Sequence, residues 1–406
     1  MQEDSLPDAG PSEQLEQSAW PAPPQYNWSA SPGVMTSVDA TNLSSEVQGC
    51  FFRSARWTAD ASSVLTTAED RVLRVYDIVY DGDAPCFSTA RELPQPDAIN
   101  AALWYPSASA HAPETFCFVA STRDSPVRLV DAGDGRIRAS YPIVDHRERF
   151  ISPHSFAFNT TATKLYCGFE NAIEVLDIAS PGYHNSDRLK MGLTRKEKGG
   201  QKGIISALAF SQHMPGAFAA GSFSGSVVLY DEDTGNRAAG HLYGVEGGGV
   251  TQLVYHPLDP NTIFVASRRS DSLQAYDLRD TSQPVARLER PTSTNQRIWF
   301  DVDPWGRWLA SGDENGTVRI WDIGSPSYDA VADLKLHNDA VNSVQFHPFK
   351  PLLLTSAGSR AFLQSEDLEL SSDESDSDSD SNDEPAPISI KTGPKDSRMA
   401  IWSMAA

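Results

Sequence analysis

A segment of alternating apolar residues that ends in aspartate recurs six times, and this repeat constrains the fold more than any other feature of the chain. The copies read VLRVYDI, PVRLVDA, AIEVLDI, SVVLYDE, SLQAYDL and TVRIWDI, and consecutive aspartates lie 45–54 residues apart. Alternation with a period of two predicts β-strands, and an aspartate at a strand end predicts a turn whose backbone N–H groups it caps. We therefore predict structural turn roles, not catalytic ones, for Asp77, Asp131, Asp177, Asp231, Asp277 and Asp322.

Two further strands are predicted upstream of each aspartate. The first carries an apolar-x-apolar pair, such as Phe156/Phe158 or Val344/Phe346, and the second is short and rich in small residues, such as AFAAGS at 217–222. Three or four strands per repeat, ending in a Trp-Asp-like dipeptide, are the signature of a β-propeller blade. The sequence predicts an all-β, seven-bladed WD-repeat propeller, because a sandwich would not place six matching strand ends at near-regular spacing.

The seventh blade is predicted to be interrupted and to need a strand from elsewhere. It starts at AVNSVQFHP, runs into the acidic low-complexity segment 365–386, and resumes at RMAIWSM. Such a composition is too polar to order. We expect a disordered acidic tail over 1–24, a propeller over 25–406 and a disordered insertion over 363–397. A strand within 25–40 would complete the seventh blade and close the ring, with Trp28 docked beside it.

The net charge of −21 resides mainly in two segments and does not describe the propeller. Residues 1–49 carry seven acids and no base, and residues 366–384 carry ten acids and no base. Because local patches determine which partners are attracted, the total does not exclude an anionic partner. The four cysteines are scattered without CxxC spacing, which predicts a reducing compartment. No apolar run is long enough for a membrane span, and no secretory signal is recognisable.

The sequence contains no motif that predicts an enzyme. A GxSxG elbow, a phosphate-binding Walker loop, an HExxH helix and ligand spacing among the nine histidines are all missing. His256 and His347 precede proline in a turn pattern, and His337 is expected to hydrogen-bond a strand hydroxyl. We predict a non-catalytic protein with no cofactor, no metal site and no small-molecule substrate.

The segment TNQRIWFD at 294–301 breaks the repeat. When the blades are aligned on the apolar-x-apolar pair, the residue three positions earlier is apolar in six blades and is Arg297 in the sixth blade. A charge that departs from the repeat once points to function. The alternative is structural, with Arg297 paired to Asp271 or Glu246.

One face of the propeller is predicted to gather basic residues. The inner strands begin there, and the turns between second and third strands lie on the same side. Phosphates would be neutralised by its cations, and Asn295 and Gln296 would contact base edges. Tyr243 and Trp299 are aromatic candidates for base stacking, with Trp299 expected in the core. The candidate RNA-binding residues are Arg53, Lys202, Arg268, Arg269, Asn295, Gln296 and Arg297.

Several segments between Gly49 and Phe362 resemble the telomerase Cajal body protein family of WD-repeat proteins. They are GQKGIISALAFS, TNQRIWFDVDPWGRWLASG, HPFKPLLLTSAGSRAF and the region from His154 to Gly182. The first two are specific to that family, whereas Trp-Asp ends are shared by all WD-repeat proteins. The chain is also similar to a fungal branch associated with pre-mRNA splicing. The resemblance implies a nuclear propeller, in a Cajal-body-like compartment where one exists, with a cytoplasmic presence left open.

Two functions follow as hypotheses. The resemblance implies that the propeller binds small nuclear non-coding RNA, of the Cajal-body or telomerase type, and supports ribonucleoprotein assembly or localisation. The alternative is a protein scaffold for splicing factors without RNA contact. In both cases we expect a monomer with ribonucleoprotein or splicing partners and no membrane contact.

Overall fold

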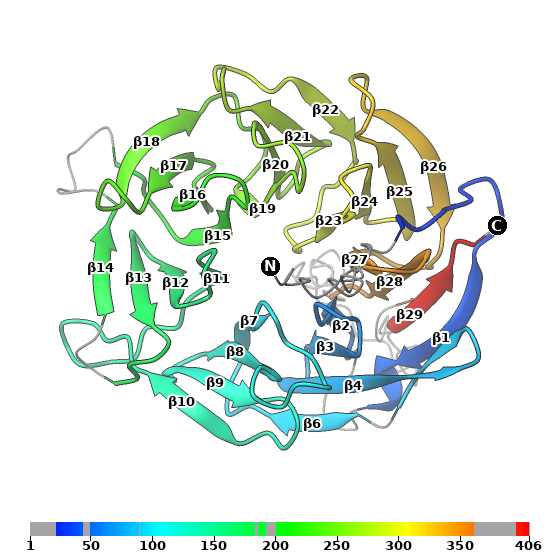
Figure 1. The fold of residues 1–406 in the computed structure, drawn as a ribbon, viewed down its shortest axis with the longest axis horizontal. Coiled ribbons are helices and arrows are strands. Elements are labelled where there is room, and N and C mark those ends of the chain that lie inside the picture. The colour runs from blue at the N-terminus through cyan, green and yellow to red at the C-terminus, as the bar shows by residue number, and fades with distance from the viewer. Residues whose placement is uncertain are drawn as a thin grey trace, which may run out of the picture.

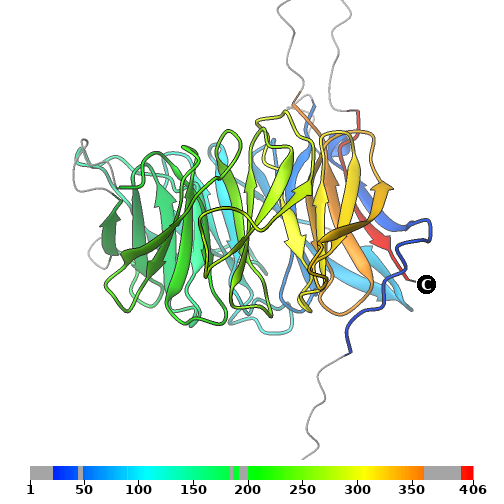
Figure 2. The same ribbon diagram turned by 90° about the horizontal axis from the view of Figure 1, so that it is seen from above.

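The computed structural model is a ring of seven β-sheets around a central axis, which confirms the predicted all-β seven-bladed propeller (Figure 1). It describes residues 22–43, 49–88, 90–182, 186–191, 200–360 and 395–405. Seen edge-on, the ring is a disc whose strands run between two faces (Figure 2). Within these ranges the only helix is the short 3-10 turn η1 (Ala40–Asn42), and no helix that could cross a membrane is found.

Each blade starts with an inner strand beside the axis and proceeds outward through antiparallel neighbours. Blade one comprises β2 (Phe52–Trp57), β3 (Ser63–Ala68) and β4 (Val72–Asp81), with β5 (Ala84–Phe87) and β6 (Arg91–Pro94) both paired to β4. Blade two comprises β7 (Ile99–Trp104), β8 (Cys117–Thr122), β9 (Val127–Asp131) and β10 (Ile137–Tyr141). Blade three comprises β11 (Ser155–Phe158), β12 (Lys164–Phe169), β13 (Ala172–Asp177) and β14 (Ser186–Lys190). Blade four comprises β15 (Ile205–Phe210), β16 (Ala217–Ser222), β17 (Val227–Asp231) and β18 (Arg237–Leu242).

The remaining blades follow the same order. Blade five comprises β19 (Val250–Tyr255), β20 (Thr262–Ser267), β21 (Ser272–Asp277) and β22 (Ala286–Glu289). Blade six comprises β23 (Phe300–Val302), β24 (Trp308–Gly312), β25 (Thr317–Asp322) and β26 (Asp329–Lys335). Blade seven comprises β27 (Val341–Phe346), β28 (Leu352–Ala357), β29 (Arg398–Ser403) and, as its outer strand, β1 (Gly33–Asp39). We call the face where the inner strands begin the start face.

The core lies between neighbouring blades. The second strand of a blade is buried on both sides, as β3, β8, β20 and β28 are throughout. Small residues in these strands let the next blade approach closely. A Cβ atom added at Gly221 would lie 2.5 Å from Val250, and one at Gly312 would lie 2.4 Å from the carbonyl of Val341. The small-residue pattern of these strands therefore serves blade-to-blade packing.

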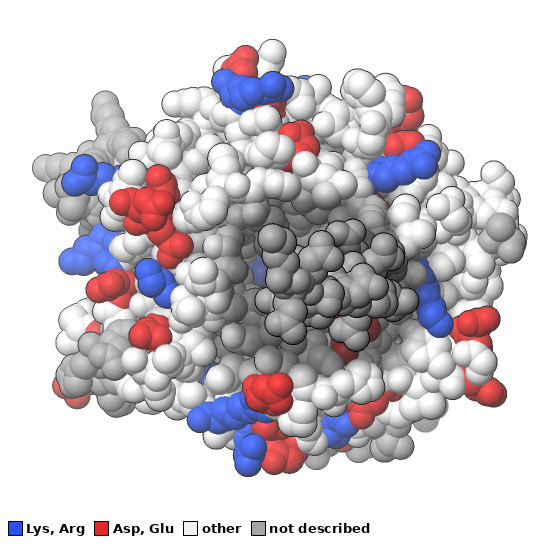
Figure 3. Space-filling view, viewed as in Figure 1, with Lys and Arg blue, Asp and Glu red and all other residues white. Residues whose placement is uncertain are grey.

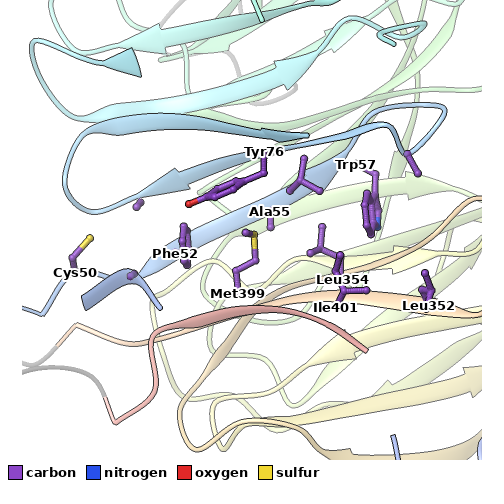
Figure 4. Close-up of a cluster of buried hydrophobic side chains, with 13 residues drawn as sticks. Cys50, Phe52, Ala55, Trp57, Tyr76, Leu352, Leu354, Met399 and Ile401 are labelled. Atoms are coloured by element: carbon purple, nitrogen blue, oxygen red, sulfur yellow. The ribbon is translucent and has the colours of Figure 1, made fainter. Parts of the chain in front are cut away.

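Blade seven meets blade one at the seam where the ring closes. Strand β1 pairs antiparallel with β29 from Gly33 opposite Ser403 to Asp39 opposite Arg398. Behind this pairing, apolar side chains of β2 pack against those of β28 and β29 (Figure 4). Trp28, just before β1, stacks on Tyr26 with 4.8 Å between ring centroids. The two ends of the chain thus hold the ring together.

Five of the six repeat aspartates cap a turn in the same way. Each accepts a hydrogen bond from the backbone N–H two residues later, at 2.8–3.0 Å, and these are Asp131, Asp177, Asp231, Asp277 and Asp322. Asp77 differs because β4 continues to Asp81, so that no turn follows it. Its carboxylate instead accepts from Ser63 Oγ and pairs with Arg91.

Most of the expected tail and insertion lies outside the described residues. Of the segment 363–397, only residues 395–397 are described, and they pack against blade seven. The backbone N–H of Lys395 donates to Asp339, and the buried Asp396 carboxylate lies 3.2 Å from Nδ1 of His337. The other ring nitrogen of His337 lies 2.7 Å from the Thr355 hydroxyl. These bonds hold residues 395 and 396 against blade seven.

Candidate nucleic-acid interface

The inner strands enclose a central channel that holds a cavity of about 580 Å³. Figure 3 shows the face opposite the start face, where Lys and Arg lie interspersed among Asp and Glu around a central hollow. The wall of the channel, by contrast, carries more basic than acidic residues. Its basic residues are Arg53, Arg56, Arg268, Arg297 and Arg360, and its acidic residues are Glu69 and Asp301. An acidic chain thus surrounds a channel with an excess of positive charge.

Arg297 lies in this channel and makes neither of the ion pairs considered from the sequence. Within the described residues it has no carboxylate partner, and Glu246 is paired instead with Arg287. Two nitrogens of the Arg297 guanidinium donate to the carbonyl of His154, at 3.3 and 3.4 Å. Because His154 precedes the inner strand of blade three, Arg297 connects blade six to blade three.

Arg297 is not the first residue of an inner strand, as the blade alignment suggested. Strand β23 begins only at Phe300, and the polar run before it is a loop along the channel. The reason lies in Trp299, whose backbone pairs with blade seven: its N–H donates to the carbonyl of Asn342 at 2.8 Å. The buried Arg290 fixes the position of this loop, because its guanidinium donates to the carbonyls of Ile298 and Ser267.

Three arginines that line the channel alternate with two aromatic rings. The guanidinium carbon of Arg56 lies 4.5 Å from the ring centroid of Trp299, and that of Arg297 lies 5.6 Å from the same centroid. Arg297 is also 5.3 Å from the ring of Phe223, and Arg268 is 4.0 Å from it. We call these five residues the arginine–aromatic row. Cation–π attraction orients the arginines without neutralising them.

The positive charges in the channel affect one another. Burial, and then the charges of Arg268, Arg53 and Arg56, lower the pKa of Arg297 to about 9. Burial also lowers the pKa of Arg56 and of Arg268. All three guanidinium groups remain protonated at neutral pH, so each favours an anion that would relieve its desolvation.

The two acids of the channel are already engaged. Glu69 pairs with Arg53 at 3.3 Å and with Arg360 at 2.9 Å. Asp301 accepts a hydrogen bond from the N–H of Phe346 at 2.9 Å, and burial raises the pKa of its carboxyl to about 7. Neither acid forms an ion pair with the arginines of the arginine–aromatic row within the described residues. These arginines are therefore open to an external anion.

The other predicted residues occupy different places. Arg53 lines the channel and also donates to the carbonyl of Ile99 at 2.8 Å. Lys202 and Arg269 are exposed and lie on the start face, outside the channel lining. Asn295 is exposed and lines the channel mouth. Gln296 belongs to the scaffold, because its amide nitrogen donates to Asn342 and to the carbonyl of Gly358.

Sequence reasoning missed Arg56 and Phe223 and placed Trp299 in the core, whereas its ring lines the channel half-exposed. A signal for Arg56 was present. It is the middle residue of the apolar-x-apolar pair Ala55/Trp57, and the same position in blade six holds Asp301. That middle residue faces the channel in both blades. Phe223 had no such signal, because it lies in a turn of blade four and meets Arg268 and Arg297 only in the folded ring. Tyr243 is exposed and does not line the channel.

The arrangement is suited to binding, and its chemistry is that of an anion site. Guanidinium groups recognise phosphate by paired hydrogen bonds and charge. Among the described residues, no group of three or more His, Cys, Asp or Glu side chains could hold a metal ion.

Comparisons with known proteins agree with the repeat. The model of the family described as "WD domain, G-beta repeat" matches residues 290–322 and 329–361. Telomerase Cajal body protein 1 of Homo sapiens is 35% identical over 323 residues, which cover 77% of this chain and 58% of the human protein. The Bos taurus protein of the same name is 32% identical over 380 residues, covering 89% of this chain and 68% of the bovine protein. The chain thus spans less than two thirds of the human relative's length.

A fission yeast protein is similar over most of both chains. It is the Schizosaccharomyces pombe protein named Guanine nucleotide-binding protein negative regulator 1. It is 28% identical over 342 residues, covering 78% of this chain and 82% of its own length.

Proposed function

Since the chain belongs to the telomerase Cajal body protein family of WD-repeat proteins, we propose that it binds small nuclear non-coding RNA through its start face. In this proposal the protein is non-catalytic and nuclear. It supports the assembly or localisation of a ribonucleoprotein, of the Cajal-body or telomerase type.

The observation that carries the proposal is the set of arginines without carboxylate partners at the mouth of the channel. The chain as a whole has a net charge of −21, but most of that charge lies in residues 1–49 and 366–384, so the propeller itself can attract nucleic acid where cations gather. Uncompensated cations on one face of such a protein are a local attraction for phosphates. RNA would therefore be oriented toward the start face.

The proposed role of each residue in RNA binding follows from its exposure. Arg268 and Arg297 at the channel mouth would contact phosphates, and Lys202 and Arg269 on the start face would extend that contact outward. Asn295 is exposed and can donate to or accept from a base edge. Gln296 is left out of this role, because its amide is committed to Asn342 and Gly358.

The test is ultraviolet crosslinking and recovery of RNA from cells, comparing wild type with Arg297→Glu. The matched control is Arg307→Glu, an exposed arginine of the same blade that precedes β24 and lies on the opposite face. We expect small nuclear RNA with the wild type and the control, and its loss with Arg297→Glu.

Two results would reject the proposal in different ways. If no variant yields RNA while protein complexes still form, the propeller is a protein scaffold, and the splicing alternative is favoured. If wild type and Arg297→Glu recover RNA equally, the RNA surface lies elsewhere.

A further inference from the structure

Two guanidinium groups inside the channel have no hydrogen-bond acceptor. Within the described part of the chain, the side chains of Arg56 and Arg268 donate no hydrogen bond and form no ion pair, and the Nε of Arg268 is buried without a partner. Arg297 has only one acceptor, the carbonyl of His154, shared by two nitrogens at 3.3 Å or more. Partly buried charged donors without acceptors are costly, so a protein retains them where a ligand supplies the acceptors.

These donors line one cavity of the channel and come from different blades. Arg56 comes from β2 of blade one, Arg268 follows β20 of blade five, and Arg297 precedes β23 of blade six. All three line the same cavity of about 580 Å³, which is within the size range of small-molecule sites, roughly 300–1,000 Å³. A ligand there must be compact and must present anionic oxygens in several directions.

The aromatic rings of the site favour a phosphate ligand over a stacked base. Trp299 already has both Arg56 and Arg297 close to its ring, and Phe223 has both Arg268 and Arg297. A base would have to displace these guanidinium groups to stack. Phosphate oxygens would instead add to them, because the N–H edges of Arg56 and Arg268 are free while the rings hold the guanidinium planes.

We infer that the channel is a binding site for a free, compact small molecule with several phosphate groups, such as an inositol polyphosphate or a nucleoside triphosphate. The site does not depend on the proposed RNA function, since its deepest arginine, Arg56, lies inside the channel rather than on the start face. Bound there, the ligand joins blades one, five and six and removes the repulsion among their arginines. It is therefore a ligand that stabilises the ring.

The test is isothermal calorimetry on the full chain in about 150 mM salt, with inositol hexakisphosphate and ATP as probes, together with the Tm with and without each probe. We expect binding of at least one probe with a rise in Tm. Arg56→Gln should weaken the binding about tenfold or more, since it removes a charged donor pair. Arg268→Gln serves as a second variant if Arg56→Gln does not fold, and Arg307→Gln, on the opposite face, should leave the affinity unchanged.

RNA oligonucleotides with a 5′-phosphate or a 5′-hydroxyl distinguish a free polyphosphate from the phosphate at an RNA end. If only the 5′-phosphorylated RNA binds in a manner that depends on Arg56, the free ligand is rejected and the channel receives an RNA end. If neither probe binds, or if Arg56→Gln and Arg307→Gln bind equally, the site is rejected. The variant Arg269→Glu should weaken RNA binding but not polyphosphate binding, so failure of one proposal is distinguishable from failure of the other.

Discussion

Asp301 is a carboxyl group whose surroundings disfavour its ionised form. It faces the channel between Arg56 and the buried Asp303, and burial raises its pKa to about 7 against the usual 3.8. The N–H of Phe346 and the charge of Arg56 act in the opposite direction but do not outweigh burial. The folded protein therefore keeps a proton that the unfolded chain releases between about pH 4 and pH 7.

This predicts a stability difference that depends on pH. Asp301 favours the unfolded state increasingly as pH rises through the window from 3.8 to about 7, and Asp301→Asn removes that effect. The free energy of unfolding of Asp301→Asn minus that of wild type should rise by roughly 1–2 kcal/mol from pH 4 to pH 8. A shift of roughly three pKa units at about 1.4 kcal/mol per unit would give about 4 kcal/mol, and the expected change is smaller because the group is partly exposed. Urea unfolding at several pH values measures it, and a flat difference, as expected for the exposed Asp83→Asn, would contradict it.

A second buried charge lies in blade one. The side chain of Arg74 is 1% exposed and contacts Asp70 at 2.5 Å and Glu92 at 2.8 Å. Asp70 is itself 3% exposed, whereas Glu92 is 51% exposed. Asp70 is therefore the partner that neutralises the charge of Arg74 inside the core.

Removal of the Asp70 carboxylate should destabilise the protein. We expect Asp70→Ala to lower the free energy of unfolding by about 3 kcal/mol, because it leaves a buried guanidinium with only its exposed partner. Asp83→Ala, which loses only a weak contact to Lys350 at the surface, should change it by less than about 0.5 kcal/mol. Chemical denaturation of both variants provides the comparison, and equal effects would show that Arg74 is compensated by other means.

At the scale of elements, the ring depends on a strand from the far end of the chain. Strand β1 is the outer strand of blade seven and shields the paired edge of β29. The Asp39 carboxylate at its end accepts from Ser397 Oγ at 2.5 Å and so links it to the chain leading into β29. Without β1, the outer edge of β29 would be open and the seam between blades seven and one would be uncovered.

Truncation tests this role. Deletion of residues 1–43 should lower the Tm strongly and broaden the unfolding transition, because blade seven loses its outer strand. Deletion of residues 1–21 keeps Tyr26, Trp28 and β1, and it should leave the Tm within a few degrees of wild type. Circular dichroism during heating measures both, and an unchanged Tm in the longer deletion would show that β1 does not hold the ring closed.

At the scale of the whole molecule, acidic and basic residues gather in different parts of the sequence. The acidic segments are residues 1–49 and 366–384, whereas the arginines of the arginine–aromatic row come from blades one, five and six. Attraction of an anion depends on the local charge of the channel, and it weakens as salt screens the charges.

RNA affinity should therefore fall steeply with salt. If three or four cations contact phosphates, the slope of log K against log salt concentration is about −2 to −3 for single-stranded RNA. Replacing both start-face cations in the variant Lys202→Gln/Arg269→Gln should make the slope shallower by about 1–1.5 units. Fluorescence anisotropy at several salt concentrations measures the slopes, with Arg307→Gln as the control. A slope near zero in the wild type would contradict an interface based on phosphates.

The repeat alone was sufficient to predict the architecture. Alternating strands, small-residue second strands and turn aspartates are local signals, and together they specify the same blade along the chain. Local physics likewise explains why Asp131 and Asp322 cap turns, since their partners are two residues away. The departure of Arg297 from the repeat also pointed to a residue that lines the central channel.

The geometry of the site was decided only by the tertiary structure. Arg56, Phe223 and Trp299 come from three blades, and their distances depend on how the ring closes. Trp299 joins the inner strand of blade seven through its backbone, which exposes its ring and turns the preceding residues into a loop. Gln296 is bound to Asn342 and Gly358 for the same reason. The sequence by itself therefore determined the blades, because strand and turn preferences are local, whereas the channel exists only where seven blades meet.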